Sequence, residues 1–365
     1  MRIAIVTDYF IPTFTGVTTS VCQVLDRLAA TGHEAMVLCP GPAPSSYRGF
    51  PVHTVRGVSV GGLRLRGRTA ELERHLTDFA PDVVHVASLL GLGTRGVNAA
   101  DHLDIPSVAV FQTDLPDRLA HPSSKSLRRA LSVAGMTLAP STAAMQLLAD
   151  SDVPRVGHWA RGVDTTIYHP DRRGSELTRE LRQCLAPNGE TIVGYVGRLT
   201  PEKELHRLAE LADLPGVSLA IVGDGRERDR LEQLMPRASF LGHRQGMELA
   251  GTYAAFDLFV HPGRHATFGQ TLQEAMASGL PVVAPAAGGP LDIVRPGVTG
   301  LLFDPDRCGA LRETVGGLVA DPAMRTRMGQ SARTKITRRN WPIAVDELVG
   351  IYRKVTAPSY IRRVA

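Results

Sequence analysis

The feature that most constrains the fold is a repeated alternation of short apolar runs with helical patterns. The runs of the first half are "RIAIVTD", "EAMVLCP", "VHTVR", "DVVHVAS", "SVAVFQT" and "MTLAPS". Those of the second half are "TIVGYVGRL", "VSLAIVGDG", "SFLGH", "DLFVHPG", "LPVVAPA" and "TGLLFDP". Helical patterns follow several of them, such as "TSVCQVLDRLAATG", which ends at a glycine stop signal. This alternation is typical of a parallel sheet with helices on both faces.

The two series of runs are separated by an irregular stretch rich in glycine and proline, "RVGHWARGVDTTIYHPDRRG". The chain has 365 residues, enough for two domains that each bury a core. We therefore predict two doubly wound, Rossmann-like α/β domains, residues 1–160 and 161–340. The last helix, "WPIAVDELVGIYRKV", and the rest of 341–365 are predicted to return to the first domain. Ligands are expected at the carboxyl ends of the strands, in a cleft between the domains.

Composition excludes several classes of protein. The net charge of +5 is spread along the chain and aromatic residues make up 5%, which argues against nucleic-acid binding while allowing affinity for phosphates. No stretch approaches the roughly 18 apolar residues of a membrane span. The first apolar run is interrupted by Asp8, which favours a buried strand over a signal peptide. Four cysteines without short spacings indicate reduced thiols in a cytoplasmic protein.

A basic pair follows a strand in "GYVGRLTPEKELHRLAELA". Arg198 opens the loop after that strand, and Lys203 is predicted to begin a helix. Cationic side chains beside the free N–H groups of a helix start form a clamp for a diphosphate. Solvated surface charge is the alternative interpretation of this pattern.

A carboxylate lies on a short apolar helix in "HATFGQTLQEAMASG". The backbone N–H groups of Thr267 to Thr271 are predicted to point from the helix start into the cleft. Glu274 follows one turn later, and a carboxylate in such surroundings is costly to bury unless it meets hydrogen-bond donors. Ligand hydroxyls or a buried arginine would both supply them.

Three further patterns are weaker. Gly16 precedes a helix, where it would let a phosphate approach the backbone or would be an ordinary loop glycine. Asp304 and Asp306 have the spacing of a metal motif, but we predict that they cap a helix. His261 and His265 are predicted to be loop residues, because a proline and a glycine separate them. We predict no metal site.

Taken together, these motifs resemble the retaining GT-B glycosyltransferases of glycosyltransferase family 4. The resemblance is greater to the bacterial GDP-mannose-dependent α-mannosyltransferases, and it covers nearly the whole chain. It is carried by "PTFTGVTTSV", "PDVVHVAS", "LAPSTAAM", "WARGVDTTIYHP", "VGRLTPEK", "VGDG" and "FVHPGRHATFGQTLQEAMASGLPVVAPAAGGP". It implies a GT-B fold in which the first domain takes the acceptor and the second takes a nucleotide diphosphate sugar, with a GDP-sugar favoured. No separate cofactor is implied.

The resemblance also assigns roles to individual positions. Arg198 and Lys203 match the basic pair on the donor diphosphate, and Glu274 matches the second glutamate of the E-x7-E element, which binds the ribose hydroxyls. Gln112 and Asp114 are assigned to the reacting centre. The other donor-facing positions are Gly16, Ala266, Thr267, Phe268, Gly269, Gln270 and Thr271.

Two positions depart from the family pattern. Ala266 stands where the family has the first glutamate of the E-x7-E element, which contacts donor-sugar hydroxyls. Gln112 stands where many relatives have a histidine, although the α-mannosyltransferase branch often has glutamine there. Three explanations of Ala266 are open: an introduced substitution, a donor sugar that lacks the usual hydroxyl, or a natural change of reaction. Arg264 and Gln112 favour a natural divergence.

The family implies transfer with retention by a front-face path, in which the leaving diphosphate accepts the proton of the acceptor. The acceptor would be a lipid or a small metabolite. A peripheral membrane contact through a basic surface is open, with a solvated loop as the alternative; its residues are Arg56, Arg64, Arg66, Arg68, Lys125, Arg128 and Arg129. A non-catalytic nucleotide-binding paralogue is the competing class. An NAD-dependent oxidoreductase is disfavoured because the glycine fingerprint is missing.

Overall fold

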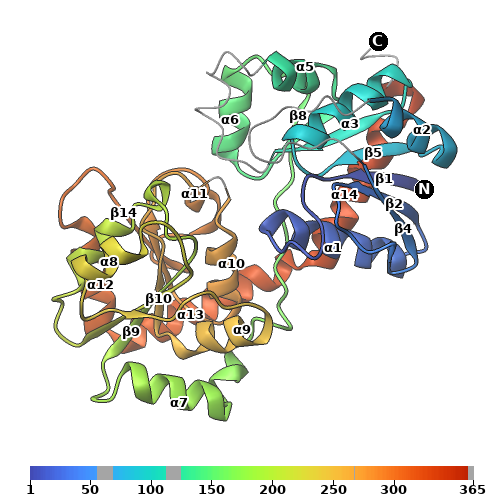
Figure 1. The fold of residues 1–365 in the computed structure, drawn as a ribbon. Helices are drawn as coiled ribbons and strands as arrows, with labels where there is room; N and C mark the ends of the chain where they lie inside the picture. Colours follow the sequence, from blue (N-terminus) through green and yellow to red (C-terminus); the bar gives the residue numbers. More distant parts are fainter. Residues whose placement is uncertain (56–68, 112–124, 267, 361–365) are drawn as a thin grey trace. The chain divides into compact units, whose positions relative to one another are not determined.

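The computed structural model describes residues 1–55, 69–111, 125–266 and 268–360. The chain divides into two units, Met1–Arg161 with Trp341–Ala365 (unit 1) and Gly162–Asn340 (unit 2). Each unit contains one sheet with helices on both of its faces (Figure 1). The predicted fold class, two doubly wound α/β domains, is confirmed.

The sheet of unit 1 has the strand order β3-β4-β2-β1-β5-β6-β7-β8. All neighbouring strands are parallel except β3 and β4. The order reverses between β1 and β5, so the segments that follow these two strands meet at the carboxyl edge of the sheet. The strands are β1 Arg2–Val6, β2 Glu34–Cys39, β3 Ser46–Tyr47, β4 Phe50–Thr54, β5 Val83–Val86, β6 Ser107–Val110, β7 Met136–Ala139 and β8 Val156–His158.

The helices of unit 1 cover its sheet unequally. One face packs against α1 (Gly16–Ala30) and α14 (Trp341–Val355), which lie side by side (Figure 1). The other face packs against α2 Thr69–Phe79, α3 Gly91–His102, α5 Lys125–Val133 and α6 Thr142–Asp150.

The helix α14 is an integral part of unit 1. The Trp159 indole Nε1 donates to the carbonyl oxygen of Ala344 at 2.7 Å. A buried hydrogen bond of 2.8 Å joins the Tyr352 hydroxyl to Nδ1 of His85 on β5. Both bonds satisfy polar groups that would otherwise be buried without partners, and they hold the helix in one position on the sheet.

The sheet of unit 2 is entirely parallel, in the order β11-β10-β9-β12-β13-β14. Counted along the chain this is the order 3-2-1-4-5-6 of the doubly wound mononucleotide-binding fold. The order reverses between β9 and β12, which places a crevice outside their carboxyl ends. The strands are β9 Thr191–Val196, β10 Val217–Val222, β11 Ser239–Phe240, β12 Leu258–Val260, β13 Val282–Pro285 and β14 Gly300–Phe303.

Two helical layers bury the faces of this second sheet. One consists of α7 Glu176–Leu185, α9 Gly246–Ala255, α10 Gln270–Ala277, α11 Pro290–Ile293 and α13 Pro322–Ile336. The other consists of α8 Arg228–Leu234, α12 Ala310–Ala320 and the 3-10 helix η4 Leu205–Leu211. The shorter 3-10 turns are η2 Pro170–Gly174, η3 Pro201–Lys203 and η5 Thr337–Arg339.

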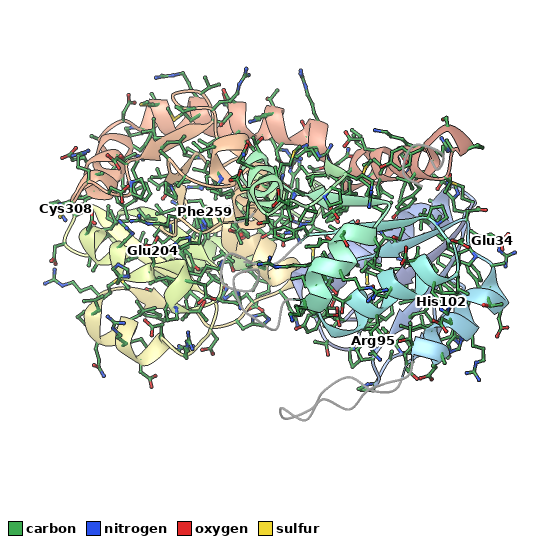
Figure 2. All side chains as sticks on the ribbon, turned by 90° about the horizontal axis from the view of Figure 1, so that it is seen from above. Glu34, Arg95, His102, Glu204, Phe259 and Cys308 are labelled. Carbon is green, nitrogen blue, oxygen red and sulfur yellow. The ribbon has the colours of Figure 1, made fainter. Side chains whose placement is uncertain are left out.

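Two further observations concern the cysteines and the length of the helices. All four cysteines are free, with Cys39 buried and Cys184 and Cys308 exposed (Figure 2 labels Cys308). Among the described helices, none combines the length and apolar character that crossing a bilayer requires.

Candidate active site

The switch point of unit 2 collects most of the predicted donor residues. Arg198 follows the carboxyl end of β9, and the loop from His261 to Ala266 follows the carboxyl end of β12. Because these strands are parallel neighbours, both loops lie at the same edge of the sheet. Ligands of open α/β sheets bind at this edge.

Arg198 is the more exposed member of the basic pair. Its side chain is 67% exposed, and its guanidinium lies 3.4 Å from an oxygen of Glu202. The Tyr195 hydroxyl donates to the carbonyl oxygen of Arg198 at 3.2 Å, which fixes the backbone there. Burial raises the pKa of Tyr195, so this donor keeps its proton. An exposed ion pair contributes little stability, so the guanidinium can exchange Glu202 for a ligand phosphate at small cost.

The prediction that Lys203 begins a helix is wrong. Lys203 ends the short 3-10 turn η3, and the chain then passes through Glu204 in the left-handed conformation, with φ 50° and ψ 37°. This conformation breaks the helical path before η4 begins. Any contribution of Lys203 to a diphosphate site therefore comes from its side chain and not from a helix N-terminus.

Glu204 ties together the loops around the switch point. Its carboxylate accepts from the backbone N–H of Arg264 at 2.8 Å and lies 3.3 Å from the Arg264 guanidinium. Arg264 also pairs with Asp306 at 2.8 Å.

The predicted helix cap at Asp304 and Asp306 is wrong. The N-cap of α12 is Gly309, and Asp304 instead accepts from the N–H of Asp306 at 2.9 Å within a turn.

The start of α10 is built on a glycine. Gly269 is the N-cap, with φ 92° and ψ 45°, and no side chain caps the helix. A Cβ atom at this position would lie 3.0 Å from Leu272 and 3.1 Å from Ile293, so both the backbone angle and the packing require glycine. An uncapped helix start of this kind favours binding of a negatively charged group.

A backbone hydrogen bond anchors the loop before α10. Ala266 is 7% exposed, and its carbonyl oxygen accepts from the N–H of Gly289 at 2.8 Å. Phe268 is buried beside it. Gln270 and Thr271 are half-buried in the first turn of the helix. Thr267 lies outside the described residues.

Glu274 is half-buried on α10 and receives a hydrogen bond that the sequence did not indicate. The Tyr253 hydroxyl on α9 donates to Glu274 Oε2 at 2.8 Å. Burial, followed by the negative charge of Glu274, raises the pKa of Tyr253 well above its usual value, so it remains a donor. The same two causes raise the pKa of Tyr168. The sequence offers a buried arginine as one possible donor to Glu274. In the structure the donor to Oε2 is the hydroxyl of Tyr253.

The two histidines of the loop differ strongly. His265 is exposed, whereas His261 is 6% exposed and follows β12 directly. Burial, and then the charge of Lys203, lower the pKa of His261 to about 4, so its imidazole is neutral near pH 7. Among the described residues neither ring nitrogen of His261 has a hydrogen-bond partner. Nor do those residues include a cluster of three or more histidine, cysteine or acidic side chains that could hold a metal ion.

Unit 1 contributes fewer of the predicted residues. Gly16 is the exposed first residue of α1, whose N-cap Thr15 accepts from the N–H of Thr18. Gln112 and Asp114 lie outside the described residues, as do Arg56, Arg64, Arg66 and Arg68.

Asp8 interrupts the first apolar run of the sequence, and the structure gives it a role that this pattern does not indicate. It is buried after β1, where its carboxylate accepts from the Ser88 hydroxyl at 2.7 Å and from the N–H of Leu92 at 2.6 Å. The protein's own carboxylate therefore occupies the N-terminus of α3. The start of α10, in contrast, has no side-chain cap.

The chain has two doubly wound units, and the predicted donor residues lie in the second. This is the arrangement of the GT-B class of glycosyltransferases. Solved structures agree on the fold. HepE of Anabaena, determined in complex with UDP, has a TM-score of 0.81 at 22% identity, covering 97% of this chain and all of that one. Sucrose-phosphate synthase of Thermosynechococcus elongatus has a TM-score of 0.81 at 21% identity, covering 97% and 98%.

Comparisons with family models and with named relatives identify the family of the chain. The model described as Glycosyltransferase Family 4 matches residues 14–167, and the model described as Glycosyl transferases group 1 matches residues 178–335. A GDP-mannose-dependent alpha-mannosyltransferase of Mycolicibacterium smegmatis is 45% identical over 99% of this chain and 100% of its own. A protein of the same name from Corynebacterium glutamicum is 38% identical over 98% and 90%. The chain belongs to this family of glycosyltransferases and is an enzyme of that class, which confirms the family expected from the motifs.

Proposed function

We propose that the enzyme transfers a mannose-type hexose from a GDP-sugar to a hydroxyl group of an acceptor, with retention of configuration. The observation that carries the proposal is the likeness, at 38–45% identity over nearly the whole chain, to relatives named as GDP-mannose-dependent alpha-mannosyltransferases. Arg198, Lys203 and Glu274 stand at the motif positions for the donor diphosphate and ribose.

The proposed chemistry is a front-face displacement. The bond between the anomeric carbon and the leaving phosphate oxygen breaks, while the acceptor oxygen bonds to that carbon on the same face. The acceptor's proton passes to the departing diphosphate. Arg198, Lys203 and the N–H groups at the start of α10 stabilise the negative charge that grows on the leaving group. These cations supply the required charge, so turnover is expected to survive EDTA.

Nucleotide binding tests the proposal first. GDP should raise the thermal unfolding midpoint more than UDP or ADP at equal concentration. Arg198→Gln and Lys203→Gln should each weaken GDP binding and slow transfer. Arg230→Gln is the matched control, because Arg230 is 71% exposed and also pairs with a nearby glutamate, at 3.1 Å, but lies on α8. If both site variants behave like Arg230→Gln, the proposed diphosphate site is wrong.

Ala266 allows a second test of the same site. The family glutamate at this position holds donor-sugar hydroxyls, and a hydrogen bond to a charged group is worth about 1.5–3 kcal/mol. If mannose occupies the donor-sugar position beside residue 266, Ala266→Glu should tighten GDP-mannose binding relative to GDP by at least about tenfold. An unchanged ratio would show that a carboxylate at this position does not reach the mannose hydroxyls.

The acceptor is proposed to be a lipid or a small hydrophilic metabolite. Lys125, Arg128 and Arg129 on α5 belong to the basic surface that a lipid acceptor would require. Co-sedimentation with anionic vesicles tests membrane attachment, and replacing these three residues with glutamine should abolish pelleting. Failure of the wild-type protein to pellet would favour a small metabolite.

A further inference from the structure

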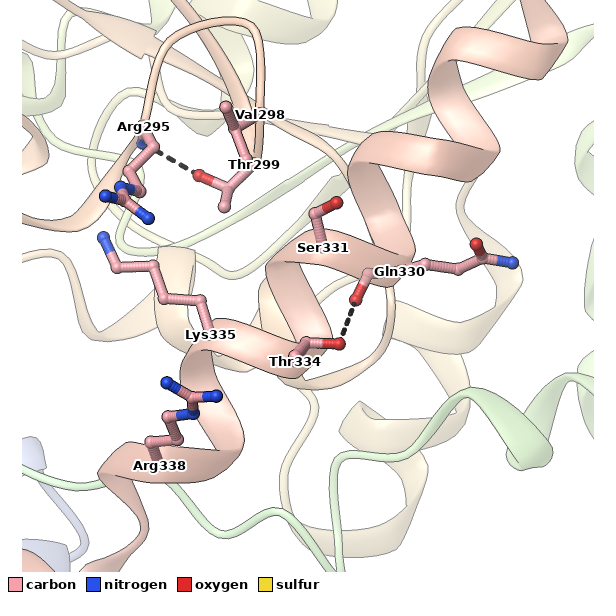
Figure 3. Close-up of a pocket in the computed structure, with 8 residues that line it drawn as sticks. All are labelled: Arg295, Val298, Thr299, Gln330, Ser331, Thr334, Lys335 and Arg338. Atoms are coloured by element: carbon pink, nitrogen blue, oxygen red, sulfur yellow. Dashed lines mark hydrogen bonds between the residues drawn. The ribbon is translucent and has the colours of Figure 1, made fainter.

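We propose that unit 2 carries a second anion site, which binds a phosphate group and is separate from the candidate active site. The site is a pocket of about 380 Å³. Figure 3 shows the residues that line it: Arg295, Val298, Thr299, Gln330, Ser331, Thr334, Lys335 and Arg338.

The pocket lies at the opposite edge of the sheet from the donor residues. Thr299 immediately precedes β14, so it marks the amino edge of the parallel sheet. Arg198 and His261 follow β9 and β12 and mark the carboxyl edge. An anion bound beside Thr299 is therefore not the donor diphosphate.

Three cationic side chains from two segments line the pocket. Arg295 comes from the loop after α11, and Lys335 and Arg338 come from the end of α13 and from η5. In Figure 3 the Arg295 guanidinium and the Lys335 ammonium group lie close together on one side. Among the described residues, none of the three forms a salt bridge with a carboxylate. Like charges held together in this way repel one another unless an anion lies between them.

The surroundings of Lys335 show this repulsion. Its ammonium group donates to the carbonyl oxygen of Ile293 at 2.6 Å, which leaves two of its three N–H donors for a ligand. Burial, and then the charge of Arg295, lower the pKa of Lys335, while Asp292 acts in the opposite direction. A bound dianion would remove the repulsion and use the remaining donors.

Favourable interaction with a helix end explains only part of the cluster. Cations near the C-terminus of α13 interact well with its dipole, and this accounts for Lys335 and Arg338. Arg295 belongs to another segment. Its backbone N–H is fixed by a 2.8 Å bond to the Thr299 hydroxyl, a bond that Figure 3 also draws. A turn thus fixes the backbone of Arg295, whose guanidinium lies close to Lys335.

The chemistry fits a phosphate group better than a carboxylate. Ser331 and Thr334 already donate their hydroxyl hydrogens to backbone carbonyls, so the cations supply the donors. Two guanidinium groups and an ammonium group match the charge and the several oxygens of a phosphate. The phosphate would come from solution or from a phospholipid headgroup. Val298, which lines the pocket and is 48% exposed, is an apolar side chain that a lipid surface would cover.

Phosphate binding is tested by equilibrium dialysis with inorganic phosphate. Lys335→Met and Arg338→Gln are compared with wild type and with Arg327→Gln, which removes an exposed arginine of the same helix outside the pocket. The donor site is intact in all four proteins, so any difference reports on the pocket. The pocket variants should lose one bound phosphate, or bind it at least about tenfold more weakly. Arg338 is exposed, so Arg338→Gln is expected to fold even if Lys335→Met does not.

A vesicle arm distinguishes the two sources of phosphate. The four proteins are sedimented with vesicles of phosphatidylcholine alone and with added phosphatidylglycerol. Pelleting that needs phosphatidylglycerol and is lost in both pocket variants assigns a lipid headgroup. Phosphate binding without such pelleting assigns a soluble phosphate. If the pocket variants match Arg327→Gln in both assays, the proposal is overturned.

Discussion

The hydroxyl group of Tyr253 is expected to control nucleotide affinity without touching the nucleotide. It donates to Glu274 Oε2 at 2.8 Å from a fully buried position. Tyr253→Phe removes this donor and leaves the ring in place. A hydrogen bond to a charged group contributes about 1.5–3 kcal/mol. Glu274 is only half-buried, so water can replace the hydroxyl in the free protein, and we expect the stability loss to lie near the lower limit.

The effect on binding follows from the position of the carboxylate. If Glu274 binds the ribose, losing the donor that orients it should raise the GDP dissociation constant by about tenfold, equivalent to about 1.4 kcal/mol. Isothermal titration calorimetry measures the constant, and thermal unfolding measures the stability.

A matched substitution separates binding from stability. Tyr352→Phe also removes one buried tyrosine hydroxyl, which bonds to His85 at 2.8 Å in unit 1. It should lower stability by about 1 kcal/mol and leave GDP affinity unchanged. If Tyr253→Phe and Tyr352→Phe bind GDP equally well, within twofold of wild type, the assignment of Glu274 as a ribose ligand held by Tyr253 is refuted.

Three other outcomes are expected. Gly269→Ala should destabilise the protein by about 1–3 kcal/mol and weaken GDP binding, because φ is 92° and the new methyl group would lie 3.1 Å from Ile293; urea unfolding and calorimetry measure the two effects. Burial lowers the pKa of His85 to about 3, so the unfolded chain takes up a proton below about pH 6.5 while the folded protein does not. His85 alone should therefore account for a loss of about 2 kcal/mol of stability from pH 7 to pH 5, and His85→Gln should reduce the pH dependence measured in urea titrations by about that amount. Arg264→Gln removes the ion pairs to Glu204 and Asp306, and we expect slower transfer in a steady-state assay with little change in the unfolding midpoint.

Much of the fold could be predicted because most strands lie within continuous apolar runs. The strands that were missed, β3 (Ser-Tyr) and β8 (Val-Gly-His), are the edge strands of the sheet of unit 1, and neither contains two consecutive large apolar residues. The helix α14 was predicted with the bounds that the structure has, since its apolar face repeats over four turns.

The site was less predictable because it depends on contacts between separate segments. The letters "PEKE" resemble a helix start, and nothing in them indicates that Glu204 adopts a left-handed conformation held by Arg264. The partnership of Tyr253 with Glu274 arises from the packing of α9 beside α10, which sequence spacing does not encode. The roles of Arg198 and Glu274 came from the family motifs and stay predictions.

The return of the chain to unit 1 has a consequence for biosynthesis. Trp341, Val345 and Tyr352 belong to the same apolar cluster as Ile3 and Ile5, yet all of unit 2 lies between them in sequence. On the ribosome, the first strand must wait for the final helix before its outer face is shielded, while unit 2 can already be complete. A nascent chain halted before Trp341 should therefore be a substrate for chaperones through unit 1, and supplying residues 341–360 as a separate peptide should release it.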